Sequence, residues 1–174
     1  SEVTNAAMGG MVYSYSFDDI GNRQWATAGA SLSAFAANNL NQYAAVTNAG
    51  EDVPVAYDLD GNMTRNGQWV YAWDGENNMR SVTPASLTNG SRRVVNGYDY
   101  LKRRWRKCVE ELTGYVPPAG SPPVPGNPGQ WVPVGTVYYV WDGWNIAAEV
   151  VVDEVAPATN ITYYTWGLDL SGSL

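Results

Sequence analysis

Hydrophobic and polar residues alternate along much of this chain with a period of two, which is the pattern of β-strands. Trp69, Tyr71 and Trp73 fall on one side of such an alternation. The same alternation gives two further sets that share a face, Val137, Tyr139 and Trp141, and Ile146, Ala148, Val150 and Val152. Short turn-forming segments separate these runs. The pattern therefore predicts an all-β fold of consecutive antiparallel hairpins.

A short motif recurs along the chain, and it marks the ends of the predicted strands. An aromatic residue closes a strand-like run, Asp usually follows, and a turn rich in Gly or Asn leads into the next run. The copies lie at Tyr15–Arg23, Tyr57–Met63, Tyr71–Met79, Tyr98–Arg104, Tyr139–Asn145 and, in a degenerate form, Tyr164–Asp169. The intervals between them are uneven, which favours a repeat with variable loops over a strict solenoid.

Each part of the motif suits a hairpin turn. Asp at the first corner accepts hydrogen bonds from backbone N–H groups just ahead, and Gly or Asn tolerates the left-handed residue that follows. Such a segment between two alternating runs is a strong hairpin signal. Turns are predicted near Asp18–Asn22, Asp58–Asn62, Asp74–Asn78, Leu101–Arg103 and Asp142–Asn145.

Two segments interrupt this rhythm. Ala28–Leu40 is rich in Ala and places Leu32, Phe35 and Ala36 at helical spacing, so a short helix or an irregular strand is expected there. Tyr115–Gly135 holds seven of the chain's ten Pro residues and is expected to form an exposed loop. Because strand patterns resume beyond it, this loop is interpreted as an insertion within one domain that covers residues 1–174.

Composition supports the β prediction and narrows the chemistry. Eight Trp and twelve Tyr stand beside only two Phe, and such residues suit half-buried pleated surfaces. The net charge of −7 repels a phosphate backbone. The chain has no His, which removes the commonest general base and metal ligand, and its single Cys108 forms no internal disulfide. No apolar run is long enough for a membrane span, the start lacks a signal pattern, and both ends look cut.

These repeats resemble the rearrangement-hotspot (Rhs) or YD-repeat family over nearly the whole chain. The similarity is strongest in seven stretches: Tyr15–Arg23, Asn39–Val46, Tyr57–Arg65, Trp69–Val82, Tyr98–Lys107, Tyr139–Glu149 and Tyr163–Ser173. The last of these is similar to the stretch shortly before the core region of such proteins. The chain departs from the family's pattern at Lys102, where the repeat usually has Gly, and this puts the turn geometry there in question.

The resemblance implies a fold and a role. Hairpins of this family wind as a curved, spiralling YD-repeat sheet, and full-length relatives form a hollow shell around a C-terminal toxin or effector. In many relatives a following core region carries an aspartyl autoprotease, which lies outside this sequence. The expected function is therefore a non-catalytic structural module of a toxin-encapsulating bacterial protein, secreted or at the cell surface. Its expected partners are neighbouring repeats and the cargo.

Several segments that resemble functional sites are better explained as structure. Asp58–Asn62 starts like a calcium loop, but Met63 and Trp69 stand where an EF-hand needs Gly and Glu. The Asp-Gly pairs at Asp74 and Asp142 are interpreted as turns rather than as an aspartic protease dyad. Cys108 lacks a His base, and Pro122–Pro125 matches a PxxP ligand only formally. No catalytic, cofactor-binding or metal-binding residue is therefore predicted, and no cofactor.

Three binding hypotheses follow from the same residues. The cluster Lys102–Lys107 holds half of the basic residues and one Trp, but a solvent-facing strand paired with acids explains it better than nucleic-acid binding. Trp and Tyr on hairpin faces could stack on sugar rings, so a carbohydrate- or cell-surface-binding module is the alternative function. Open sheet edges are also expected to make the isolated chain self-associate, unless the Pro-rich loop or Ala28–Leu40 caps an edge.

Overall fold

A computed structural model describes residues 3–118 and 126–166, and these are arranged as antiparallel β-strands without a helix among them. The predicted all-β class is therefore confirmed. The strands are β1 (Asn5–Met8), β2 (Met11–Phe17), β3 (Arg23–Ala28), β4 (Ser31–Ala37), β5 (Tyr43–Asn48), β6 (Glu51–Val53), β7 (Val55–Tyr57), β8 (Met63–Asn66), β9 (Trp69–Trp73), β10 (Met79–Pro84), β11 (Arg92–Tyr98), β12 (Arg104–Val116), β13 (Asn127–Asp142), β14 (Asn145–Asp153) and β15 (Ala158–Tyr163).

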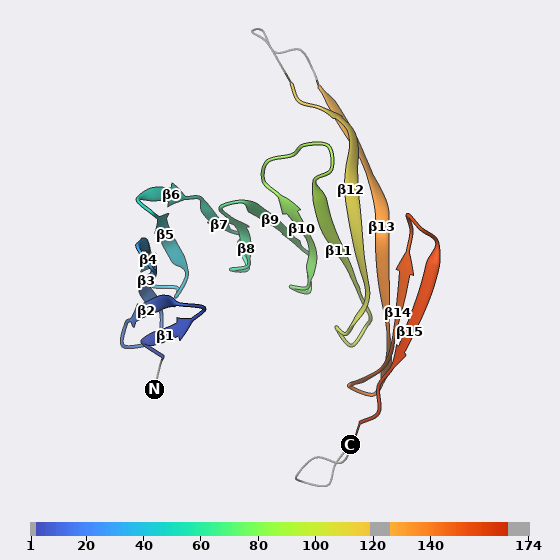
Figure 1. Cartoon of the computed structure of the whole chain (residues 1–174), viewed down its shortest axis with the longest axis horizontal. Helices are drawn as coiled ribbons and strands as arrows, with labels where there is room; N and C mark the ends of the chain where they lie inside the picture. The colour runs from blue at the N-terminus through green and yellow to red at the C-terminus, as the bar shows by residue number, and fades with distance from the viewer. Residues whose placement is uncertain (1–2, 119–125, 167–174) are drawn as a thin grey trace. The chain divides into compact units, whose positions relative to one another are not determined.

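The strands form a six-stranded sheet and a nine-stranded sheet, and in both the hydrogen-bonded order is the order along the chain (Figure 1). The backbone divides into two compact units, Ser1–Trp69 and Val70–Leu174. Every pair of neighbouring strands can therefore be joined by a short local connection, as the repeating motif predicts. The expectation of one continuous repeat domain stays a prediction.

Five hairpins of the described residues share one type of five-residue turn, found at Asp18–Asn22, Asn38–Gln42, Asp58–Asn62, Asp74–Asn78 and Asp99–Arg103. In each, the backbone N–H of position 1 donates to the carbonyl of position 5 at 2.8–3.0 Å. The N–H of position 4 donates back to the carbonyl of position 1 at 3.0–3.2 Å. Four of these turns are among those predicted from the sequence; Asn38–Gln42 was not predicted as a turn.

Position 4 of the turn has left-handed backbone geometry in every copy. Its φ is 90° at Gly21, 62° at Asn41, 85° at Gly61, 62° at Asn77 and 62° at Lys102. Gly takes this conformation freely and Asn with little strain, whereas Lys does so at some cost. The turn at Lys102 nevertheless makes the same backbone hydrogen bonds as the others, so the departure from the family's pattern leaves the geometry unchanged.

Of the two alternatives expected for Ala28–Leu40, a short helix or an irregular strand, the structure has a strand. Residues Ser31–Ala37 form β4, which pairs with β3 on one side and with β5 on the other. Leu32 lies opposite Thr27, and Phe35 lies opposite Val46. Pairing on both sides gives hydrogen-bond partners to the backbone N–H and C=O groups of β4. These hydrogen bonds favour the strand more than the helical spacing of its few apolar residues favours a helix.

The Pro-rich loop is shorter than Tyr115–Gly135. Pairing of β12 with β13 continues out to Val116 and Asn127, so the connection begins after Val116. Residues of β13 before Gly135 pair with β12 alone, because pairing with β14 begins at Gly135. On the side of β13 that faces away from β12, these residues have no partner strand, so a proline breaks no bond between strands there. This explains how Pro128 and Pro133 fit in a strand. Pro122–Pro125 lies outside the described residues.

Several hairpins carry one extra residue soon after the turn. In the first, Arg23 pairs with Phe17 and Trp25 with Ser16, which leaves an unpaired residue between them. These bulged residues are Gln24, Ala44, Thr64, Trp105 and Ala147. A bulge strengthens the local twist and offsets the alternation of side chains.

The last bulge corrects one predicted face. Ile146 pairs with Trp141, whereas Ala148 pairs with Val140. Trp141 and Val140 are consecutive residues of β13 and point to opposite sides of the sheet. Ile146 and Ala148 therefore lie on opposite faces, and the prediction that they share one is wrong.

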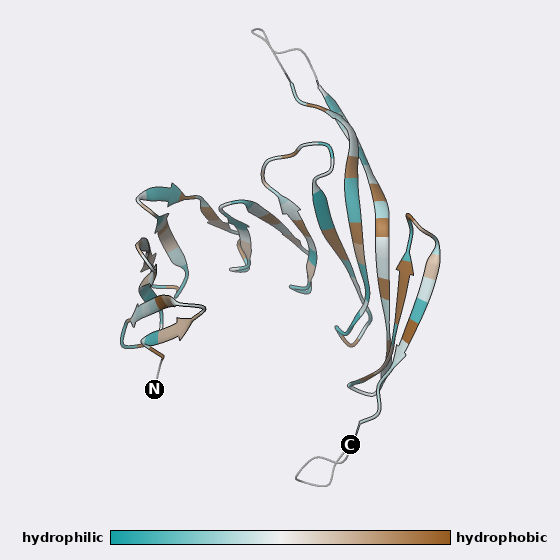
Figure 2. Cartoon of the chain, in the orientation of Figure 1, coloured by the Kyte–Doolittle hydropathy of each residue, from teal (hydrophilic) through white to brown (hydrophobic). Residues whose placement is uncertain are grey.

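Few side chains are fully buried in this fold. Among the described residues the buried hydrophobic ones are Cys108, Leu112 and Ala148, accompanied by the polar Asn96 and Thr136. All of them belong to strands of the second unit. Figure 2 shows hydrophobic and hydrophilic residues alternating along strands such as β13. A sheet with so small a core depends on strand pairing and on its turns.

We expect substitution of turn glycines to test this dependence. Gly61 is at position 4 of its five-residue turn and Gly143 is in the two-residue turn between β13 and β14, with φ of 85° and 58°. Gly61→Val and Gly143→Val should each lower the free energy of unfolding by about 1 kcal/mol or more, because a β-branched side chain is strained at positive φ. Gly61→Asn should cost less, since Asn41 and Asn77 hold the same position with φ of 62°. Urea denaturation measures all three, and equal midpoints for wild type and Gly61→Val would contradict the turn assignment.

Candidate functional site

The side chain at position 1 organises each turn by accepting backbone hydrogen bonds. Its Oδ1 atom accepts from the N–H of position 3 at 2.9–3.1 Å and from the N–H of position 5 at 2.7–3.0 Å in all five turns. Asn38 does this with an amide oxygen at the same distances as the four aspartates. The Asp side chains at position 1, including Asp58, are therefore explained by the hydrogen bonds that form the turn.

The side chain at position 5 completes the turn. Asn22 donates through Nδ2 to Asp18 Oδ2 at 2.9 Å, and Asn62 does the same to Asp58 at 3.1 Å. In the second turn the roles reverse, and Asn38 Nδ2 donates to Gln42 Oε1 at 3.2 Å. Position 5 thus needs a side chain that can bond to position 1, which explains Asn, Gln and Arg there.

These hydrogen bonds lower the pKa of the turn carboxylates. For Asp18 the main cause is the Asn22 side chain, and for Asp74 it is the backbone N–H of Asn78. At Asp58 and Asp99, desolvation acts against the change in pKa, and hydrogen bonds from position 5 outweigh it. All four groups are stabilised as anions in the folded chain.

Neighbouring turns are joined side by side in the first unit. Asn22 Nδ2 donates to Asn41 Oδ1 at 2.6 Å, and Gln42 Nε2 reaches the carbonyl of Gly61 at 3.5 Å. Tyrosine hydroxyls add a second link, because Tyr43 Oη accepts from the N–H of Arg23 at 3.2 Å and Tyr57 Oη from the N–H of Tyr43 at 3.1 Å. The motif therefore supplies both the turn and its attachment to the next one.

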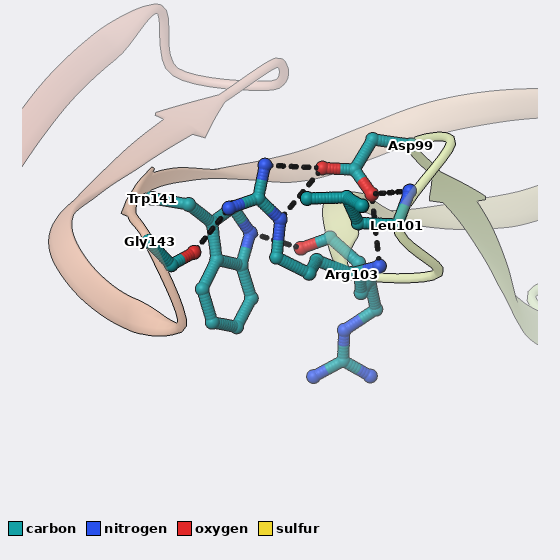
Figure 3. Close-up of polar contacts among 6 residues, drawn as sticks. Asp99, Leu101, Arg103, Trp141 and Gly143 are labelled. Carbon is teal, nitrogen blue, oxygen red and sulfur yellow. Dashed lines mark hydrogen bonds and ion pairs between the residues drawn. The ribbon is translucent and has the colours of Figure 1, made fainter.

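In the second unit, the basic residues of the turn at Asp99–Arg103 make the lateral links. Lys102 Nζ donates to the carbonyl of Glu76 in one neighbouring turn at 3.0 Å. Arg103 donates to Asp99 Oδ2 through Nε at 2.8 Å, and through Nη1 to the carbonyl of Gly143 in the next hairpin (Figure 3). The Arg103 guanidinium also lies 5.7 Å from the ring centre of Trp141. Arg103 thus closes its own turn and fastens it to the following hairpin.

Beside this junction lies an open groove. It is lined by Tyr98, Lys102, Arg103, Arg104, Tyr139, Trp141, Trp144 and Ile146, and has a volume of about 340 Å³. Arg104 stacks over the ring of Tyr139 at 5.1 Å, and the indole N–H of Trp141 donates to the carbonyl of Arg104 at 3.1 Å. Aromatic rings and guanidinium groups therefore share one concave surface, and no local pattern in the sequence predicts that they meet.

The structure divides the basic run Lys102–Lys107 between the two faces of the sheet. Trp105 stacks with Tyr138, with ring centres 6.1 Å apart, whereas Arg104 lies over Tyr139. Tyr138 and Tyr139 are consecutive in β13 and so point to opposite faces. The run does not form the continuous basic track with stacked aromatics that a nucleic acid strand requires.

The remaining sequence candidates are not among the residues that line this groove. Cys108 is fully buried, and its Sγ accepts a hydrogen bond from Thr136 Oγ1 at 3.4 Å. Asp142 and Asn145 pair across the two-residue turn of Gly143 and Trp144. Of the degenerate repeat at Tyr164–Asp169, residues beyond Trp166 lie outside the described part of the chain. Within the described ranges, there is no cluster of three or more potential metal ligands and no helix able to span a membrane.

The turn carboxylates predict an acid-sensitive stability. Because their pKa values are lowered in the folded chain, the unfolded chain takes up protons first, so the free energy of unfolding should fall as the pH drops below about 4. Asp18→Asn should keep the turn, as Asn38 does, and make that fall shallower. Asp19→Asn is the matched control, since no hydrogen bond to the Asp19 carboxylate is seen among the described residues. Identical pH profiles for wild type and Asp18→Asn in urea titrations would refute this explanation.

Substitutions of Arg103 can separate its two roles. Arg103→Asn restores the residue that other turns have at position 5 but loses the contacts with Gly143 and Trp141, so it should lower the free energy of unfolding by about 1 kcal/mol. Arg103→Ala should lower it further, because the turn bond to Asp99 is lost as well. Arg92→Ala, which removes an exposed ion pair with Glu111, should cost about 0.5 kcal/mol or less. Urea melts in which Arg103→Ala is no worse than Arg92→Ala would exclude the fastening role.

Comparison with known proteins gives partial matches. No family model matches the chain. The tRNA nuclease WapA of Bacillus subtilis (strain 168) and the tRNA3(Ser)-specific nuclease WapA of Bacillus spizizenii are each 37% identical to it over 78 residues, which is 42% of this chain. The chain spans about 3% of the length of these curated relatives.

Among solved structures, two toxin complexes match the chain at low identity and with TM-scores below 0.5. The crystal structure of TcdB2-TccC3-Cdc42 matches with a TM-score of 0.41 and 13% identity, covering 88% of this chain and 10% of that one. The Photorhabdus luminescens Tc holotoxin pore, with a mutated TccC3, matches with a TM-score of 0.45 and 14% identity, covering 88% of this chain and 9% of that one.

Proposed function

We propose that this chain is a non-catalytic structural module of the Rhs or YD-repeat kind, part of a wall that encloses a C-terminal toxin in a larger bacterial protein. The observation that carries the proposal is the repeated five-residue turn joined side by side to its neighbours. The polar side chains of these turns are engaged in backbone hydrogen bonds and in contacts with other turns. Such side chains build a wall and carry out no reaction.

The shape of the sheets also supports a wall. Strands follow in chain order, so further hairpins can be added at an end of a sheet without rearranging those already present. All residues of the outermost strand β15 are exposed. We propose that neighbouring repeats of the parent protein cover such edges, because an uncovered edge promotes association with other chains. Self-association of the isolated chain stays a prediction.

The sequence relatives are consistent with a module of a toxin-carrying protein. The two WapA proteins are described as tRNA nucleases, and the part similar to this chain is a small fraction of their length. We propose that the similarity concerns the wall of such a protein rather than its nuclease. Enclosed cargo and secretion or display at the cell surface belong to the same proposal.

Protease protection in the full gene product tests this function. Asp74→Ala combined with Asp99→Ala should disrupt two adjacent turns, open the wall and speed digestion of the downstream toxin region by added protease. The double variant with Asn at both positions is the matched control, because Asn38 supports the same turn. Digestion of the toxin region should then be as slow as in wild type.

Two outcomes would overturn the proposal. One is equally fast digestion of the toxin region in wild type and in both variants, which would mean that nothing is enclosed. The other is full protection in the Ala variant, after circular dichroism has shown that its hairpins are lost. Either result leaves the turn assignment intact but removes the enclosing role.

A further inference from the structure

Three Asp-Gly steps lie in or beside turns of this chain, at Asp60–Gly61, Asp74–Gly75 and Asp142–Gly143. In such a step the backbone nitrogen of Gly can attack the side-chain carboxyl carbon of Asp, and a five-membered succinimide ring forms with loss of water. Gly has no Cβ to shield its nitrogen, which makes the ring easier to close. Water then opens the ring at either carbonyl. Opening at the main-chain carbonyl gives isoaspartate, in which the backbone runs through the side chain.

Hydrogen bonds hold the carboxyl group at Asp74–Gly75. Asp74 Oδ1 accepts from the N–H groups of Glu76 and Asn78, each at 3.0 Å, and Asn78 Nδ2 donates to Oδ2 at 3.2 Å. The bond from the Asn78 N–H is the main cause that lowers the pKa of Asp74. Ring closure proceeds from the neutral acid, so the turn opposes it at this step.

At Asp60–Gly61 the attacking nitrogen is held instead. The Gly61 N–H donates to the carbonyl of Asp58 at 3.2 Å, which is one of the two backbone bonds that form the turn. The Asp60 side chain is exposed. Attack by the Gly61 nitrogen therefore requires the turn to open first.

Three Asn-Gly steps can form the same ring with loss of ammonia, and hydrogen bonds hold all of them. The Gly N–H donates to a carbonyl at 2.7 Å in Asn66–Gly67 and at 2.8 Å in Asn89–Gly90. In the third step Asn96 is only 5% exposed, and its amide nitrogen donates to the carbonyl of Met79 at 3.0 Å. Each of these steps must break a hydrogen bond before it can react.

Neither reacting group is held at Asp142–Gly143. Among the described residues, no hydrogen bond or ion pair to the Asp142 carboxylate is seen, and none from the Gly143 N–H. Asp142 is exposed, and the neighbouring Trp144 is 72% accessible to solvent, so the water that opens the ring reaches this turn. This step alone among the six has both its nitrogen and its side chain free within the described part of the chain.

The carbonyl of Gly143 is the group that fastens this hairpin to the preceding one. It accepts a hydrogen bond from Arg103 Nη1 (Figure 3). Isoaspartate adds one methylene group to the main chain immediately before Gly143 and so displaces this carbonyl. The pairing of Asp142 with Asn145 depends on the same length of main chain. Modification at Asp142 is therefore incompatible with the fastening contact as the structure has it.

We propose that Asp142 is a modification site, at which isoaspartate forms spontaneously and releases Arg103 from the Gly143 carbonyl. The Gly143 nitrogen forms a bond to Cγ, the bond from Cγ to its hydroxyl breaks, and the hydroxyl leaves as water with the proton of the nitrogen. A second water opens the ring, so the sum of the steps is an isomerisation without change of mass. The modification loosens the hairpin of β13 and β14 as the chain ages. It goes beyond the wall function and is independent of whether a toxin is enclosed.

Incubation of the full chain in a mildly acidic buffer tests the proposal without any mutation. Mass spectrometry with electron-transfer fragmentation distinguishes isoaspartate from aspartate at each position. Isoaspartate should form at Asp142 about tenfold or more faster than at Asp60 and Asp74, because one hydrogen bond changes a rate by roughly this factor. Equal rates at the three positions, or faster formation at Asn66, would overturn the assignment to Asp142.

Substitutions then test the link to Arg103. Asp142→Glu should abolish the modification there, since its ring would have six members and closes far more slowly, and Asp60→Glu is the matched control that should leave it unchanged. Arg103→Ala should speed isoaspartate formation at Asp142 by about threefold or more, because the contact that opposes displacement of the carbonyl is lost. An unchanged rate in Arg103→Ala would refute the release of Arg103 by the modification.

Discussion

Five hairpins of this chain depend on one side-chain oxygen that accepts two backbone N–H groups at the start of a five-residue turn. The oxygen belongs to Asp in four turns and to Asn in one, and the geometry is the same. It satisfies donors that the tight turn would otherwise leave unpaired, and it holds position 4 in a left-handed conformation that even Lys102 adopts. The strands that enter and leave the turn are thereby fixed in register.

Within each unit, lateral contacts join neighbouring turns into a row. Amide side chains and tyrosine hydroxyls make them in the first unit, and Lys102 and Arg103 make them in the second. Because little of the chain is buried, each hairpin is stabilised mainly by its neighbours, as in other repeat proteins. Such a row suits a thin wall. It also leaves aromatic and basic side chains open beside the last hairpins, where Arg104 and Trp144 line a groove.

Local features of this fold could be predicted from the sequence, and features that depend on lateral register could not. The turns at Asp18, Asp58, Asp74 and Asp99 are determined by hydrogen bonds within five residues, so their motif can be recognised in the sequence alone. The turn at Asn38 was missed because Ala37 and Asn38 stand where the motif has an aromatic residue followed by Asp. The groove requires Arg103 to meet a carbonyl forty residues away, and no local pattern records that contact. The bulge at Ala147 likewise reverses the face of Ile146 without altering the alternation in the sequence.

Amide hydrogen exchange measured residue by residue tests most directly whether these side-chain oxygens organise the turns. The N–H groups at position 5, in Asn22, Gln42, Asn62, Asn78 and Arg103, each donate to the side chain at position 1. The N–H groups at position 2, in Asp19, Asn39, Leu59, Gly75 and Tyr100, are internal controls, because no hydrogen bond from them is seen. Slow exchange at position 5 together with fast exchange at position 2 in every turn is the predicted result. Position 5 amides that exchange as fast as those at position 2 would contradict the account.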